Sequence, residues 1–574
     1  MALLNARRFS VLIVVVLVVT LVGTGFSAPS ADAAKQVVGK QREAQKGKVM
    51  IKKQQLLHQW KEAKRDQRFR TMMNRVDKHL AQSQTVENEA LFQGQIDIFT
   101  VHQHAFQTDG GTVHVEMSPS DDSVGYMIVP MDPDDNNVYL DGDNLPAGAY
   151  GLVVFGGGEE TPVDYSVKLT GIPFTYISQK LPQWNVITPE KSFYRMNKTD
   201  QKLTVKASTD APMAVLFVND DEPLELINPQ NVQQDVELQL GFNTMSLMAL
   251  NHDGSALWKG FHVIKPGLKR LGGKDRFEVS ANVSKEISSR FFHASTVVLA
   301  RGDVFTDALS GVPLAVPLEG APMLLTNTNG LPTAIKEEIK RLAPERAVIL
   351  GGTGSISTSV EKQLRQLGIQ DVERISGPDR FAVSAAIGTK VAEIGSDTTI
   401  VVSGTVFSDA MSSSSVAGWG GIPILLTLKD QLPASIKTFI ANNPQIKNFI
   451  IVGGPGTVSD QVKAQLLQAR PGASVERIGG ADRYEVGVNV IHYFGLPPST
   501  LTFARGDLFT DALSGAPLAA YMGAPILLTP STKLDPKVQR YLDVNEGNTD
   551  AIYIFGGPAS VSDQVAKQLY GYIP

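Results

Sequence analysis

One phrase occurs three times in this chain at a constant spacing, and this internal repeat limits the folds that the sequence can adopt. It reads FTDALSG at residue 305, FSDAMSS at residue 407 and FTDALSG at residue 509, so successive copies lie 102 residues apart. Solenoid repeats are only about 20 to 50 residues long, whereas this period is the size of a small domain. We therefore expect three tandem domains, over residues 267–370, 371–473 and 474–574.

Each copy alternates short apolar runs with segments of helical pattern. In the first copy the apolar runs TVVLA, PMLLT and AVILGG are each followed by such a segment. Apolar strands that alternate with helices indicate a parallel, doubly wound α/β sheet with a Rossmann-like arrangement. Because the shared polar residues follow the strands, they should gather at the carboxyl edge of the sheet, where such folds place their sites.

The repeated polar residues are the candidate site. Thr306, Ser408 and Thr510 are expected to cap helices, each followed by an aspartate near the positive end of the helix dipole. We expect a structural role for Asp275, Asp379 and Asp482, which precede the arginines of the repeated DR pair, and for Asp307, Asp409 and Asp511.

The arginines of the repeat are the candidate ligand contacts. For Arg276, Arg380 and Arg483, a clamp on the preceding aspartate and a contact to an anionic ligand are both open, since arginine binds carboxylate and phosphate in a bidentate manner. The outer copies also carry an Arg-Gly-Asp triplet at the strand end, where the middle copy has Ser403 and Thr405. These outer residues are candidates for ligand binding: Arg301, Asp303, Arg505 and Asp507.

A region of alternating strands precedes the repeats. Residues 91–172 and 173–266 contain short alternating runs separated by turns rich in Gly, Asp and Asn, which predicts two all-β sandwich modules. The first module resembles the pre-peptidase C-terminal domain in the order DIFTV, GGTVHVEM, LPAGAYGLVV and DYSVKLTG. The second resembles Ig-like modules of bacterial surface proteins in the run GFNTMSLMALNHDG.

Two clusters in the first module could hold a metal, but neither pattern favours it. His102 and His104 share one strand face and His114 is close in sequence, yet no acidic partner supports zinc, and exposed strand histidines are expected instead. The loop from Asp132 to Asn144 is a calcium candidate because it is rich in oxygen ligands. It lacks the EF-hand spacing, so an acidic surface loop is expected, with no metal and no cofactor.

The N-terminus indicates export. Arg7 and Arg8 precede the apolar run VLIVVVLVVTLVG, and an Ala-x-Ala site follows, which predicts a signal peptide over residues 1–33. Residues 34–90 should form a basic helical spacer. Residues 35–80 carry 14 Lys and Arg against 4 Asp and Glu, so the alternative is an arm that contacts anionic wall polymer or lipid headgroups. The chain contains no cysteine and ends in KQLYGYIP without a covalent sorting signal.

The three copies with the pattern RxxGxDRF, FTDALSG, PILLT and GG..SVS resemble the type 2 cell-wall-binding repeat family. The resemblance implies three modules in a pseudo-threefold arrangement that attach non-covalently to an anionic cell-wall polysaccharide or teichoic-type polymer. Together with the predicted signal peptide it implies a secreted surface protein of Gram-positive type. No nucleic-acid partner is expected.

No enzyme is expected, because HExxH, GxSxG and P-loop motifs are absent from the sequence and the copies share no histidine. Two alternatives stay open. One is a cell-wall hydrolase, or a modifier of one, with an unrecognised site. The other is a surface module that interacts with or inhibits a protease. The protein partner and the choice of polymer are not specified by the sequence.

Overall fold

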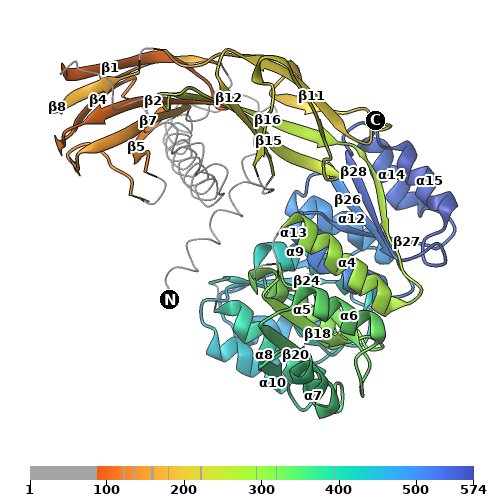
Figure 1. Ribbon diagram of the computed structural model, residues 1–574. Coiled ribbons are helices and arrows are strands. Elements are labelled where there is room, and N and C mark those ends of the chain that lie inside the picture. The colour runs from red at the N-terminus through yellow and green to blue at the C-terminus, as the bar shows by residue number, and fades with distance from the viewer. Residues whose placement is uncertain are drawn as a thin grey trace, which may run out of the picture. The chain divides into compact units, whose positions relative to one another are not determined.

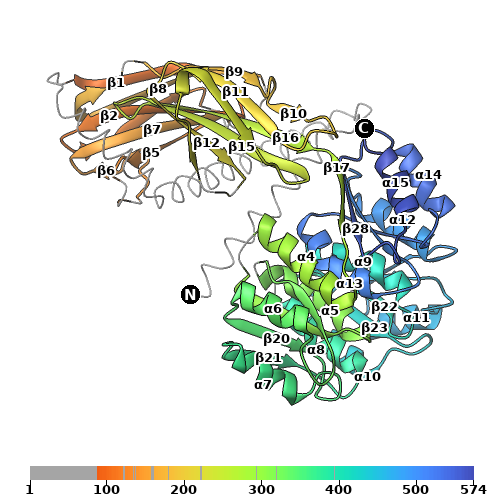
Figure 2. The same ribbon diagram turned by 45° about the vertical axis from the view of Figure 1, so that its right-hand side comes forward.

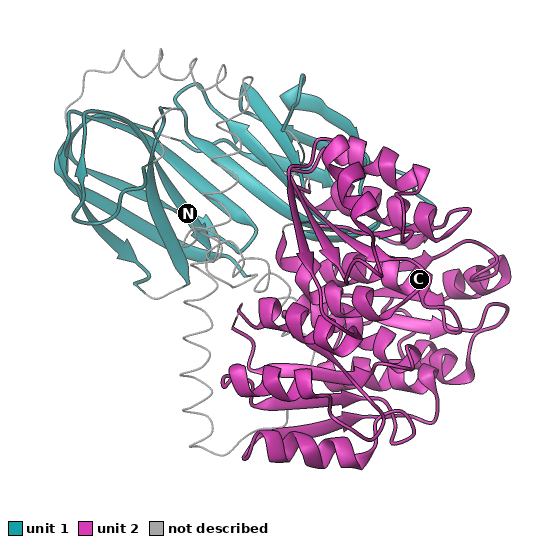
Figure 3. Cartoon of the chain, turned by 90° about the horizontal axis from the view of Figure 1, so that it is seen from below, with its two compact units in different colours: residues 1–265 teal, residues 266–574 magenta. Residues whose placement is uncertain are grey.

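The computed structural model describes residues 87–574 except 121–122, 133–134, 136, 157–160, 179, 220, 222, 292–293, 319 and 394. The predicted signal peptide and nearly all of the predicted basic spacer lie outside the described residues. The chain divides into two compact units at residues 265 and 266 (Figure 3). None of the helices in the described part is long and apolar enough to cross a membrane.

The N-terminal unit is built from strands, as predicted. The strands are β1 Glu87–Ile96, β2 Thr100–Thr108, β3 Gly111–Thr112, β4 His114–Ser118, β5 Val124–Pro130, β6 Asn144–Leu145, β7 Gly148–Gly156, β8 Val163–Ile177, β9 Trp184–Thr188, β10 Phe193–Arg195, β11 Leu203–Thr209, β12 Met213–Val218, β13 Leu224–Glu225, β14 Val232–Val236, β15 Gly241–Leu250 and β16 Ala256–Lys265. A single turn of 3-10 helix, Pro229–Asn231, precedes β14.

One sheet runs through both halves of this unit (Figure 2). Strand β2 of the first half pairs antiparallel with β16 of the second half, from Gln103 opposite Ala256 to Thr100 opposite Lys259. The two halves have separate hydrophobic cores. Buried residues from Ala90 to Phe174 form the first core, and buried residues from Met196 to Val263 form the second. The sequence pattern predicted two modules, and the shared sheet was not foreseen, because pairing between two edge strands leaves no trace in their alternation.

His102 and His104 are buried, so the prediction of exposed strand histidines was wrong for both. His102 Nδ1 lies 2.8 Å and His104 Nε2 2.7 Å from the hydroxyl of Tyr165 on β8. Burial lowers the pKa of His102 to about 4 and the pKa of His104 to about 3. His114 is exposed, 3.7 Å from a carboxylate oxygen of Asp141.

Within the described ranges, no group of three His, Cys, Asp or Glu side chains could hold a metal ion. The acidic loop from Asp132 to Asn144 includes residues that are not described, so calcium binding there stays a prediction.

The C-terminal unit alternates strands and helices (Figure 1). Its strands are β17 Gly267–Leu271, β18 Thr296–Arg301, β19 Met323–Thr326, β20 Arg346–Leu350, β21 Asp371–Ile375, β22 Thr398–Ser403, β23 Ile424–Thr427, β24 Asn448–Val452, β25 Ser474–Ile478, β26 Thr500–Arg505, β27 Ile526–Thr529 and β28 Ala551–Phe555. Its helices are α4 Arg276–Arg290, α5 Thr306–Ala315, α6 Thr333–Leu342, α7 Thr358–Gln366, α8 Arg380–Ala392, α9 Ser408–Gly420, α10 Ala434–Asn442, α11 Asp460–Ala469, α12 Arg483–Phe494, α13 Thr510–Tyr521, α14 Pro536–Val544 and α15 Asp563–Gly571.

These strands form three parallel four-stranded sheets. In each sheet three strands come from one copy and the fourth comes from the following copy, with the first copy following the third. The orders are β19-β18-β20-β21, β23-β22-β24-β25 and β27-β26-β28-β17. Strand β21 of the second copy thus completes the first sheet, and β25 of the third copy completes the second. The first strand of the unit, β17, pairs with β28 and completes the third sheet. A sequence period reports similarity between copies and not strand exchange between them.

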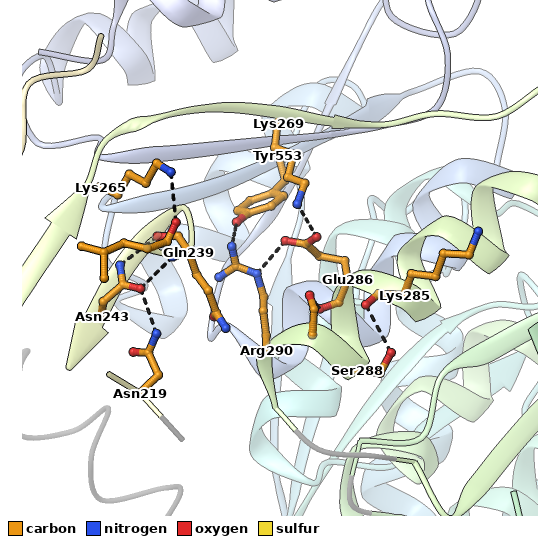
Figure 4. A network of polar contacts seen from close by, with 12 residues as sticks. Asn219, Gln239, Asn243, Lys265, Lys269, Lys285, Glu286, Ser288, Arg290 and Tyr553 are labelled. Atoms are coloured by element: carbon orange, nitrogen blue, oxygen red, sulfur yellow. Dashed lines mark hydrogen bonds and ion pairs between the residues drawn. The ribbon is translucent and has the colours of Figure 1, made fainter. Parts of the chain in front are cut away.

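An ion-pair network around the buried carboxylate of Glu286 holds this closing strand in place (Figure 4). Lys269 Nζ on β17 lies 2.5 Å, and Arg290 Nε 2.7 Å, from the carboxylate of Glu286 on α4. Arg290 also donates to the hydroxyl of Tyr553 on β28. Burial favours the neutral form of Glu286, but Arg290 and Lys269 outweigh it and hold the pKa of Glu286 below its ordinary value. The network therefore joins the first strand and helix of the unit to its last strand.

The buried histidines generate a pH prediction. In the fold both stay neutral down to about pH 4, whereas an unfolded histidine binds a proton near 6.5. Acid therefore favours the unfolded state: their contribution to stability is complete above pH 6.5 and is lost toward pH 4. Each pH unit in that window costs about 1.4 kcal/mol per histidine. Calorimetry should show a melting temperature that falls less steeply with acid in His104→Gln than in the wild type. His114→Gln should follow the wild type, and parallel curves for all three proteins would contradict the assignment.

Candidate functional site

The strand-to-helix turn of the repeated phrase carries an ion pair in the outer copies. Arg301 Nε and Nη2 both donate to the carboxylate of Asp303, the second over 2.8 Å. Arg505 and Asp507 form the same bidentate pair, with 2.7 Å for the second bond. These pairs lower the pKa of Asp303 and of Asp507. Both aspartates are more than half exposed, so the pairs lie at the surface.

The middle copy closes the same turn with hydroxyl groups. Ser403 Oγ accepts hydrogen bonds from the backbone N–H of Thr405 over 3.2 Å and of Val406 over 3.1 Å. It also lies 3.1 Å from Thr405 Oγ1. A hydroxyl pair thus replaces the ion pair between the same two positions, and the turn keeps its side-chain bridge without charge.

The glycine of this turn is required by an aromatic neighbour. A Cβ atom on Gly302 would lie 2.9 Å from the ring of Phe277, and one on Gly404 would lie 2.6 Å from Phe381. In the third copy Gly506 faces Tyr484 at 2.8 Å. The aromatic residue of the DRF or DRY phrase therefore packs on the glycine of the following phrase, which explains why both recur together.

The arginine of the DR pair binds that same glycine through its carbonyl. Arg276 Nη1 donates to the carbonyl of Gly302 over 2.6 Å. The equivalent bonds run from Arg380 to Gly404 over 2.7 Å and from Arg483 to Gly506 over 2.5 Å. The clamp considered from the sequence is thus made to a backbone carbonyl and not to the preceding aspartate.

The preceding aspartates cap helices instead. Asp275 accepts from the backbone N–H of Phe277 and Glu278, and Asp379 accepts from that of Ala382. Asp482 caps α12 and also binds Lys537 Nζ at 2.6 Å. The prediction that Thr306, Ser408 and Thr510 cap helices was wrong. Each is the first helical residue, and the phenylalanine before it occupies the cap position.

The repeated aspartates at the helix starts point at the glycine-rich loops. Asp307 Oδ2 accepts from Ser355 Oγ over 3.1 Å, and Asp409 Oδ2 accepts from Thr457 Oγ1 over the same distance. Asp511 binds Ser560 in the third copy. Burial raises the pKa of Asp307 and the pKa of Asp511. These hydrogen bonds lower both pKa values and offset only part of that rise.

Each site combines residues of two copies. Arg301 and Arg380, from successive copies, both favour the charged form of Asp307. Arg505 and Arg276 act in the same way on Asp511, so the first copy also serves the third. Arg483 of the third copy lies over the ring of Phe407 in the second, 6.0 Å from its centroid.

The three cap phenylalanines meet one another, which sequence reasoning missed. The ring centroids of Phe305, Phe407 and Phe509 lie 5.6 to 5.9 Å apart in all three pairs. Their signal in the sequence is the phenylalanine that begins each copy of the repeated phrase. The three helix starts therefore converge on one aromatic cluster.

Gly351 generates a stability prediction. Its φ is +101°, and a Cβ atom there would lie 2.4 Å from Asp307 Oδ2. Gly368 has the same φ of +101° with nothing within 4 Å of a Cβ atom, which makes it a matched control. Gly351→Ala should cost about 1 to 3 kcal/mol more in unfolding free energy than Gly368→Ala, because it adds overpacking to the same backbone strain. Equal losses in denaturant titration would contradict this contact.

Comparison with known proteins places the repeats in a family. The model of cell wall binding domain 2 (CWB2) matches residues 270–361, 374–463 and 477–566. The N-acetylmuramoyl-L-alanine amidase LytC of Bacillus subtilis is 30% identical over 53% of this chain, and the amidase enhancer of the same organism is 33% identical over 52%. The chain spans 58% and 40% of the length of these two proteins.

A solved structure shares the fold. Cwp6 from Clostridium difficile aligns with a TM-score of 0.52 at 23% identity, over 69% of this chain and 69% of that chain. The repeats indicate a protein of the cell wall or cell surface. The C-terminal unit of this chain belongs to the cell wall binding domain 2 family and contains three tandem copies of that domain.

Proposed function

We propose that this surface protein attaches non-covalently to an anionic wall polymer through three related sites, one at each strand-to-helix turn. The observation that carries the proposal is the arginine of the DR pair. Within the described chain, each of Arg276, Arg380 and Arg483 makes one hydrogen bond, through Nη1. The rest of each guanidinium can donate to a ligand, and arginine matches the geometry of phosphate and carboxylate.

The surface ion pairs extend these sites. Arg301 and Arg505 are about a quarter exposed. An exposed ion pair contributes only about 0 to 1 kcal/mol to stability, so exchange of its partner for a polymer phosphate costs little. On binding, the ion pairs of Arg301 with Asp303 and of Arg505 with Asp507 would break, and the arginines would bind the polymer instead.

We further propose that the repeats are Rossmann-like and related by a pseudo-threefold axis. The cluster of Phe305, Phe407 and Phe509 and the pairing of β17 with β28 support this arrangement, because both relate the copies in a closed order. We also propose that the first N-terminal module is pre-peptidase-like and the second Ig-like. Both would be displayed for an interaction.

Similarity to an amidase and to an amidase enhancer does not by itself indicate that this chain is an enzyme. The aligned 52% and 53% of this chain is about the length of the three repeats, which supports a likeness through the binding modules. We propose no catalytic activity. The second candidate is a modifier of a wall hydrolase, favoured by the likeness to the amidase enhancer.

The division into units generates a binding prediction. The fragment 267–574 should sediment with isolated cell walls and the fragment 34–266 should bind less, because only the first contains the three arginine sites. Walls stripped of anionic polymer serve as the control for the ligand. Sedimentation of the N-terminal fragment alone, with the repeats in the supernatant, would contradict the proposal.

The arginines generate a second prediction. Arg301→Ala and Arg505→Ala should weaken wall binding and change the unfolding free energy by less than about 1 kcal/mol. Arg380→Lys should keep a donor near the carbonyl of Gly404 while losing the bidentate edge, so binding should fall more than stability. Arg365→Ala is the control, since Arg365 on α7 is exposed, lies outside the three turns and donates to the backbone carbonyl of Gln370. If the arginine variants unfold early while the folded fraction binds normally, these residues are structural.

A further inference from the structure

The three strand-to-helix turns differ in whether they carry a negative charge of their own. Their sequences are RGDVF at 301–305, SGTVF at 403–407 and RGDLF at 505–509. Each outer turn thus contains one carboxylate side chain, Asp303 or Asp507, and the middle turn contains none. This difference bears on polymer binding, because an internal carboxylate and a polymer phosphate or carboxylate bind the same guanidinium groups.

In the outer turns this carboxylate already binds the arginine of its own turn. Arg301 donates to Asp303 through Nε and Nη2, and Arg505 donates to Asp507 through the same two atoms. A bidentate anionic ligand uses two parallel N–H groups of this kind. Both aspartates are more than half exposed, so they lie at the surface where a polymer would approach.

The same carboxylates also interact with the arginines of the DR pair. The hydrogen bonds from Arg301 lower the pKa of Asp303, and the positive charge of Arg276 lowers it further. In the third copy Arg505 and then Arg483 act in the same way on the pKa of the equivalent carboxylate. Each outer carboxylate therefore offsets part of the positive charge of two arginines.

The middle turn is closed by neutral groups instead. Ser403 Oγ accepts from the backbone N–H groups of Thr405 and Val406 and lies 3.1 Å from Thr405 Oγ1. Arg380 donates through Nη1 to the carbonyl of Gly404 over 2.7 Å, as its counterparts do in the outer turns. The hydroxyl groups that replace Arg and Asp therefore keep the turn closed and remove its negative charge.

Arg380 is also more accessible than its two counterparts. It is exposed, whereas Arg276 and Arg483 are half-buried. Arg483 also lies over the ring of Phe407, 6.0 Å from the ring centroid, within reach of a cation–π contact. Arg380 and Arg276 each act on a buried helix-start aspartate of a neighbouring copy, so that contact does not distinguish them. Of these three arginines, Arg380 is thus the most open to an anionic ligand.

We propose that the middle turn, with Arg380, is the principal anion-binding site of the three repeats, and that Asp303 and Asp507 are internal competitors that weaken the two outer sites. This inference rests on the proposed function, because it ranks the three sites proposed there for the phosphate or carboxylate groups of the wall polymer. The polymer has to displace a carboxylate from Arg301 or Arg505 to bind an outer turn, whereas it meets hydroxyl groups in the middle turn. The repeats then provide one strong contact and two weaker ones.

Removal of the outer carboxylates tests this ranking. Binding isotherms of the full chain are measured on cell walls isolated from the organism that produces it, before and after acid extraction of their anionic polymers. Asp303→Asn with Asp507→Asn should tighten binding to the unextracted walls by roughly two- to fivefold, the range that corresponds to an exposed ion pair.

A matched control makes the same change in net charge away from the turns. Asp371→Asn with Asp397→Asn alters the beginning of β21 and the residue directly before β22. Both positions lie at the opposite edge of their sheets from the turns, which follow the strand ends. This control should change binding by less than about twofold, because exposed charges beyond a Debye length are screened.

The reciprocal variant transfers the outer sequence to the middle turn. Ser403→Arg with Thr405→Asp leaves the net charge unchanged and should weaken wall binding by roughly two- to fivefold, because it adds a competing carboxylate beside Arg380. Tighter binding of this variant would mean that the Arg-Gly-Asp sequence itself favours the polymer, and it would overturn the proposal. Thermal unfolding shows whether the altered turn stays folded. If it does not, the variant without the outer carboxylates still decides the question.

Three glutamine variants separate this inference from the proposed function. Arg380→Gln should lower the affinity for walls more than Arg276→Gln or Arg483→Gln does, compared at equal folded fraction. Equal losses in the three variants, or unchanged binding of the Asp303→Asn, Asp507→Asn protein, would overturn the ranking and leave the proposed sites in place. Unchanged binding of all three glutamine variants would instead overturn the proposed function.

Discussion

The parallel pairing of β17 with β28 joins the first strand of the C-terminal unit to its last sheet, and the other features of that unit depend on it. Without β17 the third sheet would end at β28, with an open edge of unpaired backbone groups. The pairing also brings α4, and with it Arg276, to the third copy, where this arginine favours the charged form of Asp511. The ion pairs of Glu286 hold the same junction. One strand exchange thus completes a sheet and a site together.

The site follows from two packing constraints that recur in each copy. The carbonyl and the missing side chain of Gly302 receive Arg276 and Phe277, and the left-handed Gly351 makes room for the carboxylate of Asp307. These residues fix where the arginines lie. The ion pair of Arg301 and Asp303 adds little to this frame, and its replacement by Ser403 and Thr405 in the middle copy leaves the turn closed. Residues that build the turn are shared by all copies, and residues at its surface differ.

Much of the fold could be predicted from the sequence, because periodicity reports local structure directly. The three copies, their alternation of strands and helices and the strands of residues 91–266 all came from such patterns. Contacts between segments far apart in sequence could not be predicted. The pairing of β2 with β16, the exchange of β17, β21 and β25 and the cluster of Phe305, Phe407 and Phe509 all depend on tertiary packing. The candidate arginines were found by residue type, but their carbonyl partners are visible only in the structure.

The central claim is that anionic wall polymer binds at the three strand-to-helix turns. Hydrogen exchange of the full chain, measured with and without purified polymer, tests it most directly because it maps contact along the whole chain. The account predicts slower exchange around residues 301–307, 403–409 and 505–511 and in the loops that precede Arg276, Arg380 and Arg483. Protection confined to the strands before residue 266, or no protection while the polymer is bound, would contradict it.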